Sequence, residues 1–151
     1  MEKKFSKRDL LMIALIFLNS AILLMGHCGY SLHRNVGYSL PHLISYGRPI
    51  GKIKRGMYVS FSHPLSKQKV TKKVIGIPGD KIDFKEDQLL VNEEKLSVFP
   101  ESKKLHLIKK KKVCEGYLFV SGSHPKSFDS RYEEFGLVPI HSIERELCPI
   151  Y

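Results

Sequence analysis

An apolar segment near the N-terminus constrains the fold of this chain most strongly. From Leu10 to Met25 the side chains are apolar apart from Asn19 and Ser20, and a basic stretch, residues 1–9, precedes them. As an α-helix the segment spans roughly 24 Å, and extension to Tyr30 brings it to roughly 31 Å, about one bilayer core. The sequence therefore predicts a single transmembrane anchor at 10–30.

A cleaved secretion signal is the alternative interpretation of this segment, since it also has a basic start and a short apolar stretch. No small-x-small cleavage site follows, and Cys28 is preceded by His27, where a lipoprotein signal needs a small residue. With a retained anchor, the positive-inside tendency places residues 1–9 in the cytoplasm and residues 31–151 on the extracytoplasmic side of an inner (cytoplasmic) membrane.

Residues 31–151 are predicted to form one mainly β domain. Short segments rich in β-branched and aromatic residues alternate with Gly, Pro and charged turns, and no helical periodicity is present. This pattern predicts a partly open, barrel-like arrangement of sheets. The expected strands are Met57 to Phe61, Val70 to Ile75, Lys81 to Phe84, Gln88 to Val91, Leu105 to Ile108, Tyr117 to Ser121 and Ile143 to Cys148.

The net charge of +10 narrows the choice of partners. A nucleic-acid partner is not expected, because the chain has neither a recognition-helix pattern nor an aromatic RNA-binding signature. Attraction to an anionic lipid surface fits the charge better. The run Lys109 to Lys112 is interpreted as a solvated loop or an edge-strand guard.

The cysteines and histidines indicate no metal site. Cys28, Cys114 and Cys148 have no metal-ligand spacing, and the histidines are scattered without one. In an extracytoplasmic domain Cys114 and Cys148 can pair as a disulfide. Three free thiols are the alternative.

Ser39 and a pair of lysines form a candidate catalytic group. Ser39 stands just beyond the apolar segment, between Gly37 and Pro41, which suit an irregular loop that holds a hydroxyl outside regular structure. A lysine acts as a base only when its amine is neutral, and burial by apolar neighbours lowers its pKa. Lys72 and Lys73 precede an apolar run, but strand periodicity alone does not decide which of the two faces inward; two exposed lysines are the alternative.

Three ordered blocks carry a resemblance to a known family. They are Ser39-Leu40-Pro41, the run from Thr71 to Asp80, which ends in Gly76-Ile77-Pro78-Gly79-Asp80, and Ser127-Phe128-Asp129-Ser130-Arg131-Tyr132 with Gly136 behind it. Together they resemble the serine/lysine signal peptidase I (S26) family. The last block, which follows Ser121-Gly122-Ser123-His124-Pro125-Lys126, is most similar to the conjugative-transfer, TraF-like branch.

The resemblance implies a role for each matching side chain. Ser39 matches the nucleophile, Lys72 the general base, and Ser127 the serine that orients the lysine amine, while Lys73 matches a neighbouring basic residue turned away. Asp129 and Arg131 match a structural ion pair; an ordinary surface pair, worth about 0–1 kcal/mol, is the alternative. No metal or organic cofactor is implied.

The chain departs from the family pattern at two places. The family usually has Ser or Thr at the position of Gly37, where a hydroxyl helps form the oxyanion hole, and loss of one such donor in another enzyme lowers the rate about 10²–10³-fold. The second departure is Glu133-Glu134, which lengthens the last block and is expected to enlarge a turn.

The resemblance implies a membrane-anchored endopeptidase that cleaves signal segments after small residues. For the TraF-like branch the implied partner is a membrane-borne pilin precursor. A general signal peptidase for secreted preproteins is an alternative. A catalytically impaired, membrane-tethered binding protein is another, and Gly37 is its main support.

Overall fold

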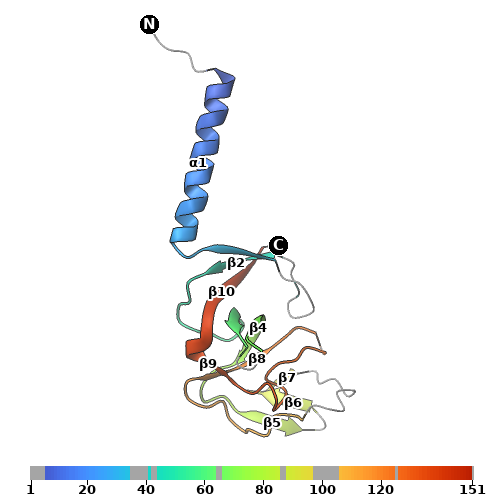
Figure 1. Ribbon diagram of the computed structural model, residues 1–151. Coiled ribbons are helices and arrows are strands. Elements are labelled where there is room, and N and C mark those ends of the chain that lie inside the picture. Colours follow the sequence, from blue (N-terminus) through green and yellow to red (C-terminus); the bar gives the residue numbers. More distant parts are fainter. Residues whose placement is uncertain are drawn as a thin grey trace.

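A computed structural model describes residues 6–34, 41, 44–63, 66–85, 88–96, 106–124 and 126–150. Within these residues the chain has one long N-terminal helix followed by two antiparallel sheets (Figure 1). In order, the elements are α1 (Lys7–His27), β1 (Ser31–Arg34), β2 (Ile44–Arg48), β3 (Tyr58–Ser62), β4 (Lys69–Gly76), β5 (Ile82–Lys85), β6 (Gln88–Val91), β7 (Glu94–Leu96), β8 (Tyr117–Ser121), β9 (Val138–Pro139), η1 (Ile140–Ser142) and β10 (Ile143–Ile150).

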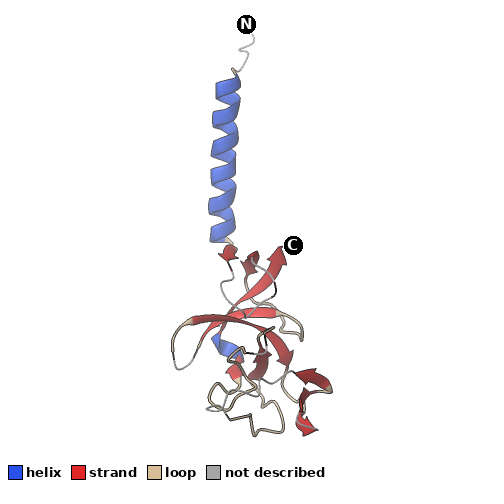
Figure 2. Ribbon diagram, turned by 90° about the vertical axis from the view of Figure 1, so that its right-hand side faces the viewer, coloured by secondary structure: helices blue, strands red, loops and turns tan. Residues whose placement is uncertain are grey.

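Helix α1 stands apart from the sheets (Figure 2), and none of its residues is buried. It begins at a capping box, in which the backbone N–H of Asp9 donates to Ser6 Oγ and the N–H of Ser6 donates to the Asp9 carboxylate. The 21-residue helix is long and apolar enough to cross a membrane. A helix that is apolar and fully exposed is compatible with a lipid surrounding. It begins and ends three residues earlier than the expected segment, 10–30.

The larger sheet has seven antiparallel strands in the order β1-β2-β10-β3-β4-β8-β9. Its central strands bury one face in a cluster that includes Val59, Phe61, Val74, Leu118 and Val120. Among the described residues the outermost strands, β1 and β9, do not pair with each other, so the sheet is not closed there. The expectation of a mainly β, partly open architecture is confirmed at this level.

The smaller sheet, β5-β6-β7, packs against the end of the larger one. Its buried side chains Ile82, Leu89 and Val91 join Ile75 of β4 and Phe119 of β8 in a second core cluster. The smaller sheet lies at the end of the molecule opposite α1 (Figure 1). Strand β4 therefore contributes to both clusters, and its second half is buried on both faces.

Most of the expected strands are present; the bounds at Gln88 to Val91 and Tyr117 to Ser121 are as expected, and the other bounds differ by at most two residues. The prediction of a strand at Leu105 to Ile108 is wrong in its described part, His106 to Ile108. Leu107 forms only an isolated bridge with Tyr132. The reason is that the backbone N–H of Ile108 donates to the carbonyl of Arg131, so this segment pairs with a turn instead of a strand.

The extra glutamates of the last block hold that segment in place. A Glu133 carboxylate oxygen accepts the backbone N–H of Lys109 at 2.9 Å, and Glu134 accepts the N–H of His106 at 3.0 Å. Both glutamates belong to the turn between β8 and β9. The two glutamates thus lie in a turn, as expected, and tie the turn to residues 106–109; that they enlarge it relative to the family pattern stays a prediction.

The cysteines are three free thiols, all within the described part of the chain. Cys28 caps the C-terminal end of α1, Cys148 lies on β10, and Cys114 is exposed. The Cys114–Cys148 disulfide is therefore not present, and the alternative expectation holds.

Candidate active site

A buried lysine and a serine meet at the inner face of β4. Lys72 lies opposite Val59 of β3 and shares its face with Val74, and both valines are fully buried. Only 4% of Lys72 is exposed. Its Nζ donates a hydrogen bond of 2.6 Å to Oγ of Ser127, which is also buried. The structure thus brings together two of the predicted site residues that are 55 positions apart.

Burial changes the acid–base behaviour of Lys72. Removal from water disfavours the ammonium form, and this desolvation lowers the pKa of Lys72. The negative charge of Asp129 opposes the effect, while the positive charge of Arg131 adds to it. The net lowering enlarges the fraction of neutral amine at a given pH, which is the form that accepts a proton.

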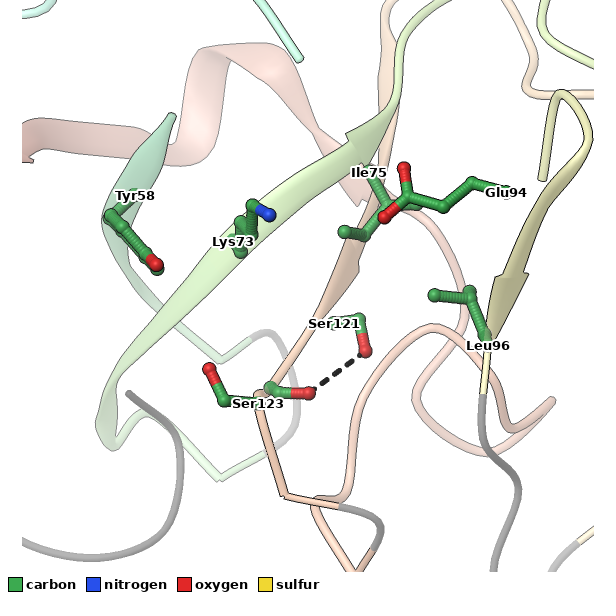
Figure 3. Close-up of a pocket in the computed structure, with 8 residues that line it drawn as sticks. Tyr58, Lys73, Ile75, Glu94, Leu96, Ser121 and Ser123 are labelled. Atoms are coloured by element: carbon green, nitrogen blue, oxygen red, sulfur yellow. Dashed lines mark hydrogen bonds between the residues drawn. The ribbon is translucent and has the colours of Figure 1, made fainter. Parts of the chain in front are cut away.

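The face of β4 distinguishes the two neighbouring lysines. Because side chains alternate along a strand, Lys73 faces the opposite side from Lys72. On that side Lys73 lines a cavity (Figure 3). The alternative of two exposed strand lysines is therefore wrong for Lys72.

Gly122 makes room for the contact between Lys72 and Ser127. A Cβ built at Gly122 would lie 2.1 Å from Ser127 Oγ, 2.6 Å from Ser127 Cβ and 3.4 Å from Lys72 Nζ. The first two distances are shorter than any ordinary carbon contact, so any larger residue there must displace Ser127. Sequence reasoning assigned no role to Gly122, because the crowding arises only when the loop after β8 folds back onto β4.

Asp129 and Arg131 form a buried ion pair beside this site. Arg131 Nη2 and Nε donate to the Asp129 carboxylate, each at 2.7 Å, and the two side chains are 3% and 0% exposed. The alternative of a surface pair is therefore wrong. Asp129 Oδ2 also accepts the N–H of Gly122 at 2.8 Å, and Arg131 Nη2 donates to the carbonyl of Ser127 at 3.0 Å. The pair thus fixes the backbone at Gly122 and at Ser127, next to the contact with Lys72.

Ser39 and Gly37 lie outside the described residues. Along the chain they fall between the end of β1 at Arg34 and the start of β2 at Ile44. Their positions relative to Lys72 stay a prediction of the sequence.

Comparison with known proteins identifies the family. The family model described as signal peptidase, peptidase S26, matches residues 9–148. A signal peptidase I from Bacillus caldolyticus is 36% identical over 110 residues, which cover 62% of this chain and 59% of that protein. The crystal structure of a signal peptidase I from Enterococcus faecalis V583 matches with a TM-score of 0.51 and 31% identity, over 66% of this chain and 99% of the other.

The chain therefore belongs to the signal peptidase, peptidase S26 family. Its antiparallel architecture matches the fold of the signal peptidase I from Enterococcus faecalis V583. The aligned part spans 59% of the length of the Bacillus caldolyticus relative.

Proposed function

We propose that this protein is a membrane-anchored serine endopeptidase that cleaves signal segments after small residues, with Ser39 as nucleophile and Lys72 as general base. The observation that carries the proposal is the buried Lys72 amine, held by Ser127 at 2.6 Å and lowered in pKa by desolvation. A lysine in this state can take a proton from a hydroxyl, which an ordinary surface lysine cannot do at neutral pH.

The reaction proceeds through an acyl-enzyme. Lys72 Nζ takes the proton of Ser39 Oγ as the oxygen attacks the scissile carbonyl, and Lys72 then returns that proton to the leaving amine. Water next attacks the ester with Lys72 again as base, and the proton goes back to Ser39 Oγ as the new carboxylate leaves. Ser127 accepts a hydrogen bond from the lysine amine and so keeps its position between these steps.

The oxyanion of the intermediate needs hydrogen-bond donors. The backbone N–H of Ser39 supplies one, whereas Gly37 provides no hydroxyl. We therefore expect a low kcat, which a hydroxyl at position 37 would increase.

The open half of β4 offers a place for the substrate backbone. Strand β8 pairs with β4 only from Lys73 onward. In the described part of the chain no strand pairs with Lys69 to Thr71 on that side. An extended substrate that adds to this edge would gain main-chain hydrogen bonds and bring its carbonyl close to Lys72.

Helix α1 sets the proposed cellular location. We propose that α1 anchors the chain in the cytoplasmic membrane, with residues 1–9 in the cytoplasm and residues 31–151 on the extracytoplasmic side. The positive net charge would hold the domain near anionic lipid headgroups. A membrane-borne substrate then meets the enzyme in the plane of the bilayer.

The proposed substrate is a pilin-type precursor of a conjugative transfer system, supported by the TraF-like form of the last block, from Ser127 to Tyr132. A general signal peptidase for secreted preproteins is the second candidate, because the similar proteins are signal peptidases I. A tethered binding protein without catalysis is the third, because Gly37 lacks the hydroxyl.

A reconstituted cleavage assay on pilin-type and secretory precursors distinguishes these candidates. The preferred precursor selects between the first two. If the natural chain cuts neither precursor but Gly37→Ser cuts one, the third candidate is favoured.

A further inference from the structure

A small polar cavity lies on the face of the larger sheet opposite Lys72. Tyr58, Lys73 and Ser121 stand side by side on the neighbouring strands β3, β4 and β8, in direct register, and all three line it. Ser123 and Glu94 complete its polar lining, with Glu94 on β7 of the smaller sheet (Figure 3).

The charged groups of this cavity are not engaged with each other. Lys73 is half-buried and Glu94 is exposed. Within the described residues neither side chain forms an ion pair or a side-chain hydrogen bond, although both line the same space. A half-buried ammonium that forms no ion pair with any described residue is suited to bind a carboxylate.

The size of the cavity limits what it can hold. Its volume is about 190 Å³, below the roughly 300–1,000 Å³ of small-molecule sites. One aspartate or glutamate side chain fits, whereas a cofactor does not.

The cavity adjoins the catalytic lysine through the end of β8. Gly122 lines the cavity, and a Cβ on Gly122 would lie only 3.4 Å from Lys72 Nζ. At Lys73 the open edge of β4 also ends, because Ser121 of β8 occupies it. A substrate that lies along Lys69 to Thr71 must therefore leave the sheet at this point, next to the cavity.

We propose that this cavity, which Lys73 lines, binds an acidic side chain near the start of the released chain, just after the scissile bond. The inference rests on the proposed function. The signal side of a membrane-borne precursor is apolar, because charges are costly in lipid, whereas the released side enters water and can carry charge. A charged cavity thus fits the released side, and Lys73 is a specificity-determining residue.

The test uses the full chain in detergent micelles and a set of precursor peptides that differ only after the scissile bond. Asp, Asn or Lys is placed in turn at the first, second and third positions of the released part. We expect Asp to exceed Asn in kcat/KM by about fivefold at one of these positions, mainly through KM, as for a favourable partly exposed ion pair. Lys at that position is expected to be cut least well.

A charge reversal makes the test specific. Lys73→Glu should invert the order, so that the Lys peptide is preferred. Lys73→Gln, a second variant in case the charge reversal disturbs folding, should abolish the preference. Lys95→Glu is the matched control, because Lys95 follows Glu94 on β7 but does not line the cavity. Lys95→Glu should keep the preference for Asp.

Two outcomes separate this inference from the proposed function. If all peptides are cut equally well, or if Lys73→Glu and Lys73→Gln leave the order unchanged, the cavity proposal is overturned and the peptidase proposal stands. If no peptide is cut, the peptidase proposal fails. Fluorescence anisotropy with labelled released-chain peptides then tests whether the cavity binds the acidic side chain. Tighter binding of the Asp peptide, lost in Lys73→Gln, supports the cavity site, and equal binding of the Asp and Asn peptides overturns it.

Discussion

Substitution of Gly122 by alanine gives a sharp test of the site geometry. The added Cβ would lie 2.1 Å from Ser127 Oγ and 2.6 Å from Ser127 Cβ, whereas ordinary contact needs at least 3.4 Å. Ser127 must therefore move by about 1 Å, and the 2.6 Å hydrogen bond from Lys72 cannot survive unchanged. Loss of a hydrogen bond to a charged or buried group costs about 1.5–3 kcal/mol.

This free energy converts into a rate. If it is lost from the transition state, Gly122→Ala lowers kcat/KM about ten- to hundredfold, since about 1.4 kcal/mol corresponds to a factor of ten. The assay is cleavage of a precursor peptide by the full chain, with folding checked by circular dichroism. Gly51→Ala is the matched control, because a Cβ at Gly51 meets nothing within 4 Å.

A double-mutant cycle with Ser127→Ala shows whether the effect runs through Ser127. In the Ser127→Ala background, Gly122→Ala should lower kcat/KM much less, because the hydrogen bond from Lys72 that it disturbs is already absent. A folded Gly122→Ala variant with the activity of the natural chain would refute the assigned geometry. Full additivity of the two substitutions would refute the explanation through Ser127.

Three further predictions concern the charges of the site. In the proposed mechanism the neutral amine of Lys72 is the active form, and burial lowers its pKa. We therefore expect kcat/KM to rise with pH through the pKa of Lys72, at a midpoint below the ordinary lysine value of about 10.4; a midpoint at or above that value contradicts the burial argument. Lys72→Met should abolish cleavage and raise the melting temperature near pH 7, because the lowered pKa means that burying the ammonium destabilises the fold at every pH below the unfolded pKa. Asp129→Asn should lower the free energy of unfolding by about 3–5 kcal/mol, because it removes the carboxylate that pairs with the buried Arg131. Arg48→Ala, which removes the partly exposed pair with Glu146, should lower it by only about 0–1 kcal/mol. Equal losses in urea unfolding would contradict this difference.

The central strands were predictable because their side chains are rich in β-branched and aromatic residues. The choice between Lys72 and Lys73 was not predictable from alternation. Strand β4 is covered on both faces where Val74, Ile75 and Gly76 are all buried, so the run is apolar throughout and has no period of two. Only the family resemblance pointed to Lys72, and the structure places that lysine inside.

Strands β1 and β2 were missed for a different reason. Both are short and have few apolar residues, and Gly47 within β2 is typical of a turn rather than of a strand. The glycine leaves room for the side chains of the neighbouring strand, since a Cβ at Gly47 would lie 2.7 Å from His33 Nε2 and 2.9 Å from Ser31 Oγ and would force them to shift. Such cross-strand crowding, like that at Gly122, depends on tertiary neighbours that a local pattern does not contain.

The roles of Ser39 and Lys72 are tested most directly by precursor cleavage with the full chain in lipid, using Ser39→Ala, Lys72→Met and the control Lys95→Ala. We expect that the first two variants release no product, remain folded and still bind the precursor, while the control cleaves like the natural chain. Undiminished cleavage by folded Ser39→Ala or Lys72→Met would contradict it.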